Sequence, residues 1–62
     1  MKQYTFELRK GERRDSVNCT SQTKGKALQA VIDAYSPEFD VLLEPIATRE
    51  AHYFYNEIDA TA

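Results

Sequence analysis

The 62-residue sequence predicts a small α+β domain in the order β-hairpin, α-helix, β-hairpin (ββαββ), with one helix packed on one face of an antiparallel sheet. Three observations support this prediction. Apolar and polar residues alternate through much of the first twenty positions, as in half-buried strands. Apolar residues then recur at helical spacing as far as a proline. Two short apolar or aromatic runs of strand length follow, and the whole chain, residues 1–62, is expected to form a single domain.

The first twenty residues are expected to form a hairpin. Gly11-Glu12 fits a two-residue type II′ turn, which prefers glycine at its first central position. This turn sets a register of four pairs: Lys10 with Arg13, Leu8 with Asp15, Phe6 with Val17, and Tyr4 with Cys19. A four-residue loop over 10–13 would leave the pairs beyond it unchanged. The apolar residues then share one face, and a slip by one residue would turn them to water.

A helix is predicted over residues 23–35. Seven apolar residues recur there at helical spacing: Ala27, Leu28, Ala30, Val31, Ile32, Ala34 and Tyr35. The hydroxyl of Thr23 can accept a hydrogen bond from a backbone N–H of the first turn, so Thr23 is the expected N-cap. Pro37 disfavours helical geometry at Ser36, and the helix is expected to end before it.

Two further segments are predicted to form the second hairpin. Residues 39–46 are an apolar run, and Pro45 either ends that strand or places it at a sheet edge, because proline has no N–H to donate. The Tyr-Phe-Tyr centre of residues 51–58 favours a strand. The same residues also fit helical spacing behind a cap at Thr48, so a helix stays an alternative. As a strand, the segment would join the previous one through residues 47–50.

Charge is divided between the two parts of the chain. Residues 1–26 hold seven basic and three acidic side chains, a net +4, whereas residues 27–62 hold one basic and seven acidic side chains, a net −6. Together they give the formal net charge of −2. This asymmetry predicts a surface with a basic end and an acidic end, which bears on the choice of partner.

Few residues are candidates for catalysis or metal binding. Cys19 is the only cysteine and His52 the only histidine, so no intrachain disulfide and no closed zinc site can form. Cys19 falls on the apolar face of the predicted hairpin, where a small core residue is expected. His52 has no candidate nucleophile nearby in the sequence. The chain is therefore predicted not to be an enzyme and to bind neither a metal nor a cofactor.

The small size of the chain bears on its stability and location. A domain this short buries only about 60% of its unfolded surface, so a homodimer is expected to add apolar burial. The N-terminus has no apolar run of the secretory type, and no stretch reaches the ~20 apolar residues of a membrane span. A cytoplasmic protein without membrane contact is predicted.

The acidic part of the chain also contains tyrosines, which are enriched at protein interfaces because they combine apolar area with a polar tip. The predicted protein-binding residues are Tyr35, Tyr53, Tyr55, Glu57 and Asp59. They indicate a non-enzymatic protein-binding module, such as a small regulator or inhibitor. The strand-strand-helix-strand order recurs in small DNA-binding arms, in antitoxin-like domains and in phage or mobile-element inhibitors, which is an analogy of fold only. In the alternative interpretation the tyrosines cover a small sheet and the acids keep it soluble.

The basic residues suggest a second hypothesis, nucleic-acid binding. The candidate residues are Arg9, Lys10, Arg13, Arg14, Lys24 and Lys26. In the predicted register Lys10 faces Arg13 and Arg9 faces Arg14, and such like-charge pairs destabilise a hairpin unless an anion offsets them. Neighbouring acids in a solvated turn would offset them equally well. The net charge of −2 disfavours binding to phosphates, so protein binding ranks first.

Overall fold

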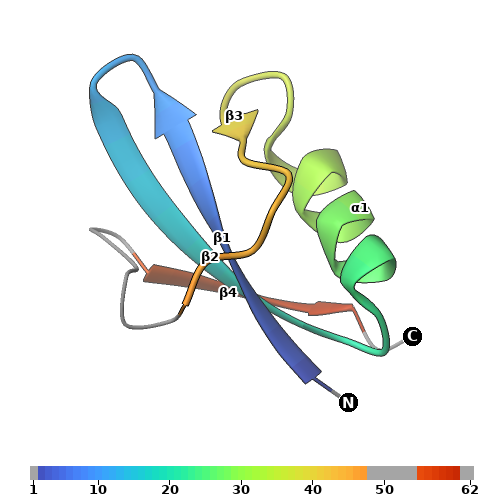
Figure 1. Ribbon diagram of the computed structural model, residues 1–62. Coiled ribbons are helices and arrows are strands. Elements are labelled where there is room, and N and C mark those ends of the chain that lie inside the picture. Colours follow the sequence, from blue (N-terminus) through green and yellow to red (C-terminus); the bar gives the residue numbers. More distant parts are fainter. Residues whose placement is uncertain (1, 48–54, 61–62) are drawn as a thin grey trace.

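The computed structural model describes residues 2–47 and 55–60, which form a four-stranded sheet and one helix (Figure 1). The elements are β1 (Lys2–Lys10), β2 (Arg13–Ser21), α1 (Lys24–Tyr35), β3 (Asp40–Val41) and β4 (Tyr55–Ala60). The strands lie in the order β3-β1-β2-β4. The predicted α+β class is confirmed.

The first hairpin has the predicted register. β1 and β2 pair antiparallel, and the four predicted pairs are all present, from Lys10 with Arg13 to Tyr4 with Cys19. Gly11 has a φ of 63°, the positive value that the first central position of a two-residue hairpin turn requires. A glycine adopts this backbone conformation without a steric penalty.

The two glycines of the chain are expected to respond to alanine in opposite directions. Gly11→Ala should lower the free energy of unfolding by about 1–2 kcal/mol, because a Cβ at positive φ is strained. Gly25→Ala should raise it by about 0.5–1 kcal/mol, because Gly25 is helical and an added Cβ would meet open space there. Urea denaturation followed by circular dichroism measures both. Equal midpoints for the two variants would contradict the turn geometry.

The helix begins and ends where the sequence predicts. The Thr23 hydroxyl oxygen accepts a hydrogen bond from the backbone N–H of Lys26 at 3.2 Å. At the other end the Ser36 N–H donates to the Ile32 carbonyl oxygen at 2.9 Å, and Pro37 follows. The predicted cap and stop are therefore both confirmed.

The core lies between α1 and one face of the hairpin. Its fully buried members come from β1, β2 and α1: Phe6, Leu8, Val17, Cys19, Ala27 and Val31. The buried position of Cys19 confirms its predicted role as a small core residue. Ile58 and Ala60 of β4 pack against the same cluster, so the last strand is attached to this core.

The predicted second hairpin is wrong, because β3 and β4 lie at opposite edges of the sheet. β3 has only two residues and pairs with β1. Beyond it, the N–H groups of Leu42 and Ile46 donate to carbonyl oxygens of β1 at 3.0 and 2.7 Å. Pro45 has no N–H to add, which limits regular pairing. The segment therefore follows the outer edge of β1, as the edge alternative for Pro45 predicts.

The sheet is mixed, not antiparallel as predicted, because β4 runs parallel to β2. In this pairing Ile58 lies beside Cys19, which brings its side chain to the core. Parallel neighbours need a long crossover connection, and the chain between β2 and β4 includes α1 and β3. The strand expected over 51–58 is confirmed for residues 55–58, and residues 51–54 lie outside the described residues. Of the expected connection, only Ala47 is described.

Candidate functional site

Strand β4 lies at one edge of the sheet, with β2 as its only strand neighbour in the described chain (Figure 1). Ile58 and Ala60 pack against the core, whereas the alternate residues Glu57 and Asp59 are exposed. Successive side chains of a strand point to opposite faces, so both carboxylates belong to the face away from α1. This arrangement presents two negative charges, two residues apart, beside the strand edge. We call Glu57, Asp59 and the β4 backbone the acidic edge.

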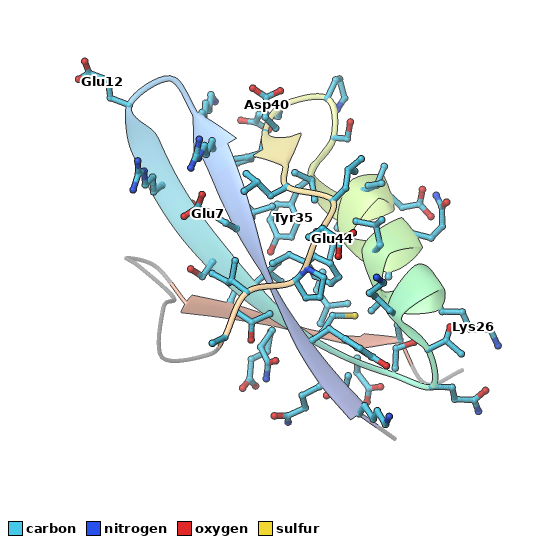
Figure 2. The ribbon with its side chains drawn as sticks, in the orientation of Figure 1. Glu7, Glu12, Lys26, Tyr35, Asp40 and Glu44 are labelled. Carbon is cyan, nitrogen blue, oxygen red and sulfur yellow. The ribbon has the colours of Figure 1, made fainter. Side chains whose placement is uncertain are left out.

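The predicted protein-binding residues do not form one surface. Tyr35 is half-buried at the end of α1 and packs against the core, with its ring 5.9 Å from that of Phe39 at an interplanar angle of 89° (Figure 2). It therefore lies on the helix side of the sheet, away from Glu57 and Asp59. Tyr55 belongs to β4, and Tyr53 lies outside the described residues. The structure brings together only the β4 members of the set.

Most of the predicted nucleic-acid-binding side chains contact carboxylates of the same chain. The ion pairs are Arg9 with Glu7 at 2.7 Å, Lys10 with Glu38 at 2.8 Å, Arg13 with Asp15 at 3.1 Å, and Lys24 with Glu44 at 3.3 Å. Lys10 Nζ also lies 5.6 Å from the centroid of the Phe39 ring. The carboxylates of Glu7 and Asp15 are nearly buried. Internal carboxylates therefore offset the like-charge pairs of the hairpin without an external anion.

The basic residues also lie in two separate places. Arg9, Lys10, Arg13 and Arg14 flank the hairpin turn, whereas Lys24 and Lys26 begin the helix that follows the far end of β2. A nine-residue strand is about 30 Å long, so the two groups are far apart. Figure 2 shows Glu12 at the hairpin tip and Lys26 at the opposite end of the molecule. The six residues do not make one continuous basic surface.

Two described side chains have shifted pKa values. Burial, reinforced by the nearby Asp59 carboxylate, raises the pKa of the Cys19 thiol above its ordinary value of 9.0. A thiol that keeps its proton is a poor nucleophile. The hydrogen bond from Lys10, together with its charge, lowers the pKa of the exposed Glu38 carboxyl. Both pKa shifts therefore result from burial and neighbouring charges within the folded chain.

Sequence reasoning missed a hollow between α1 and β3 that includes Leu43. Leu43 belongs to an apolar run that predicts a strand, and alternation along such a strand does not reveal which residues stay exposed. In the structure Leu43 is 63% exposed. The one available signal is Pro45, which indicates that regular pairing cannot continue through this part of the run.

Within residues 2–47 and 55–60, no three His, Cys, Asp or Glu side chains are grouped so that they could hold a metal ion. In the same part of the chain, no helix is long and apolar enough to cross a bilayer. Comparisons with protein-family models, with curated proteins and with solved structures found no match to this chain.

Proposed function

We propose that the chain is a non-enzymatic protein-binding module, a small regulator or inhibitor, whose acidic edge engages a basic segment of a partner protein. The observation that supports this proposal is the place of β4 at the sheet edge with Glu57 and Asp59 exposed on its outer face. The edge of a sheet offers backbone N–H and C=O groups to an added strand. Ile58 anchors β4 to the core, so the edge is held in place.

The spacing of the two carboxylates specifies the chemistry of the partner. A strand added beside β4 would place its alternate side chains next to Glu57 and Asp59. Opposite charges at such cross-strand positions stabilise a pair by about 0.2–1 kcal/mol each, whereas like charges destabilise it. Lysine or arginine at alternate positions of the partner therefore fits this edge. Two copies of β4 side by side would place carboxylates next to carboxylates, so this edge does not favour a homodimer. The homodimer expected from the sequence stays a prediction.

Nucleic-acid binding ranks second. Arg9, Lys10, Arg13 and Lys24 are engaged by carboxylates, and a phosphate backbone would have to compete with those partners. The net charge of −2 adds repulsion, because binding to nucleic acid depends on neutralising phosphates. Four cations flank the hairpin turn, and the structure describes all of them. Arg14 is the one among them without an ion pair, and a single such arginine is a weak basis for a phosphate-binding site.

Reversing one charge on the acidic edge is expected to weaken partner binding strongly. Glu57→Lys should reduce capture of the partner from an extract of the native host by about tenfold or more, because it sets like charges against each other. Glu12→Lys is the matched control, since it makes the same charge change at an exposed position of the hairpin turn. Quantitative mass spectrometry of the captured proteins measures both variants against the wild type.

Stability separates a binding effect from unfolding in this experiment. Both glutamates are exposed, so each variant should unfold within about 0.5 kcal/mol of the wild type. The proposal predicts proteins that wild type and Glu12→Lys retain and that Glu57→Lys loses. An identical set of captured proteins for all three would remove the acidic edge as the binding site.

A further inference from the structure

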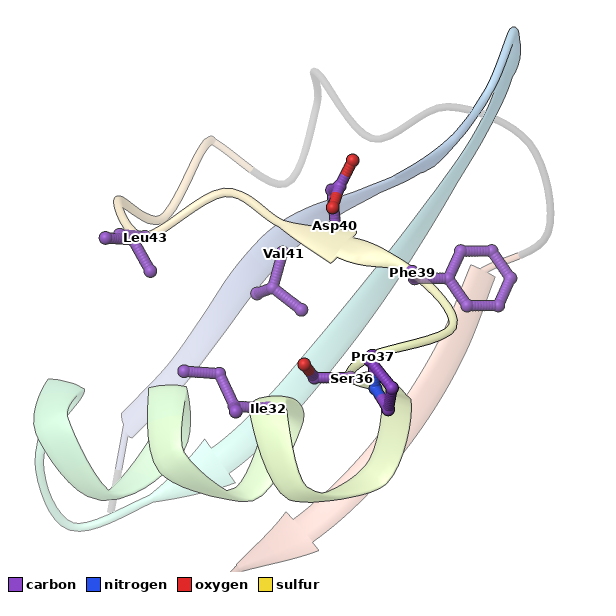
Figure 3. Close-up of a pocket in the computed structure, with 7 residues that line it drawn as sticks. All are labelled: Ile32, Ser36, Pro37, Phe39, Asp40, Val41 and Leu43. Atoms are coloured by element: carbon purple, nitrogen blue, oxygen red, sulfur yellow. The ribbon is translucent and has the colours of Figure 1, made fainter.

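A hollow of about 240 Å³ lies between the C-terminal end of α1 and β3 (Figure 3). Its lining is mostly apolar: Ile32, Ser36, Pro37, Phe39, Asp40, Val41 and Leu43. In Figure 3 the side chains of Ile32 and Val41 project toward one another from the helix and the strand, and Leu43 lies toward one end. The hollow is therefore formed by two elements that are both attached to the core.

The size of the hollow indicates what it can hold. Sites for small molecules usually measure about 300–1,000 Å³, so this one is small for such a ligand. It is large enough for one bulky side chain. Leu43 is 63% exposed, and it is the only large hydrophobic residue in the described chain with that degree of exposure. An apolar side chain placed in the hollow would cover Leu43 together with Ile32 and Val41.

The rim of the hollow is acidic, because Asp40 is one of its lining residues and three further acids each adjoin a lining residue in the sequence. Residues 27–47 contain four acids and no lysine or arginine: Asp33, Glu38, Asp40 and Glu44. All four are exposed. Lysines from other elements pair with Glu38 and Glu44. Arg9 lies opposite Asp40 in the β1–β3 pairing, but its ion pair is with Glu7. Asp33 and Asp40 therefore leave a net charge of about −2 beside the apolar lining. The Asp40 side chain projects from β3 on the side away from Val41, so its carboxylate does not fill the space between Val41 and the helix (Figure 3).

We propose that this hollow receives one aliphatic or aromatic side chain of a basic peptide segment, with flanking lysine or arginine residues of that segment facing Asp33 and Asp40. The apolar lining favours an apolar anchor side chain of the peptide. The acidic rim favours lysine or arginine on either side of that anchor through charge complementarity. The site is separate from the acidic edge, because β3 and β4 lie at opposite edges of the sheet. It adds a second contact surface to the proposed function and does not depend on the first.

A displayed library of random twelve-residue peptides, selected on the folded protein, provides a probe without knowledge of the natural partner. The selected peptides are expected to share one large apolar residue flanked by lysine or arginine. The strongest of them is then titrated into isotope-labelled protein and followed by NMR. The largest shifts should occur at Ile32, Val41 and Leu43. Failure to select any peptide, or selected peptides that lack the apolar anchor, would overturn the proposal.

Three variants locate the bound peptide. Leu43→Ser should weaken binding about tenfold by removing part of the apolar lining, and its exposed position leaves the fold unaffected. Asp40→Lys should weaken binding about fivefold or more through charge reversal. Glu57→Lys, a charge reversal on the acidic edge, should leave the affinity unchanged.

The opposite pattern would overturn the site and leave the proposed function standing. If Glu57→Lys abolishes binding of the selected peptide while Leu43→Ser does not, the peptide occupies the acidic edge and not the hollow. The peptide could instead bind the hollow while Glu57→Lys still captures the same proteins from the extract as the wild type. That result would contradict binding through the acidic edge and support the site in the hollow. The two proposals therefore fail separately.

Discussion

Replacing Leu8 with alanine is expected to remove a large part of the protein's stability. Leu8 is fully buried in the core, and Leu→Ala at such positions lowers the free energy of unfolding by about 2–5 kcal/mol. A domain of 62 residues has about 3–9 kcal/mol of stability in total. The substitution therefore removes between a quarter and all of it, because no disulfide compensates for the lost packing.

Leu43→Ala is the matched control for Leu8→Ala. The chemical change is identical, but Leu43 is 63% exposed, so the free energy of unfolding should change by no more than about 0.5 kcal/mol. Urea denaturation followed by circular dichroism compares the two variants. Similar losses at both positions would contradict the placement of the core between α1 and the hairpin.

Stability is expected to fall at alkaline pH because of Cys19. At neutral pH the thiol is protonated in both the folded and the unfolded protein, so it contributes no pH dependence. Above 9.0 the unfolded thiol loses its proton, whereas the buried thiol, whose pKa is raised, retains it. The unfolded state is then favoured, and the free energy of unfolding falls by up to about 1.4 kcal/mol per pH unit until the folded thiol also ionises.

The contribution of Cys19 is measured as a difference between two proteins. Wild type and Cys19→Ala share every other ionisable group, so both are unfolded in urea at several pH values between about 7 and 10.5, and their difference isolates the thiol. The wild type should lose stability more steeply above about pH 9, and the pH-dependent part of the difference should vanish near neutral pH. Parallel curves over the whole range would show that the thiol ionises as readily in the folded protein as in the unfolded one.

The first hairpin and the helix were predictable because their signals are local. Gly11 marks the turn, and the alternation of apolar residues on either side of it allows one register. Thr23 and Pro37 mark the ends of the helix by known effects on backbone hydrogen bonds and geometry. In each case the residues that decide the structure lie within a few positions of the element that they define.

The arrangement of β3 and β4 could not be predicted in the same way. Ile58 suits any position beside the core, and its neighbour Cys19 is far away in the sequence. The choice between pairing with β3 and pairing with β2 depends on how the whole core packs. Pro45 further limits regular pairing by β3, which makes a hairpin between β3 and β4 less favourable. Sequence order alone favours that hairpin, since consecutive strands often pair.

The candidate site was predictable in part. Alternation along a strand places Glu57 and Asp59 on one face, and the structure has them exposed there. Acidic residues surround Tyr35 in the sequence, which suggests that it shares a surface with Glu57 and Asp59. Tyr35 instead lies four residues after the buried Val31, on the inward face of the helix. That helical spacing is visible in the sequence. The hollow beside Leu43 is not, because it depends on the contact between α1 and β3.

Carbodiimide cross-linking of the captured complex tests the proposed use of the acidic edge most directly. The reagent joins a carboxylate to a lysine amine that touches it, with loss of water, so it reports contacts of the unmodified protein. Mass spectrometry of the cross-linked peptides should find Glu57 or Asp59 joined to lysines of the partner protein. Cross-links only from other carboxylates, such as Asp33 and Asp40, or a captured partner that nuclease removes, would contradict protein binding through the acidic edge.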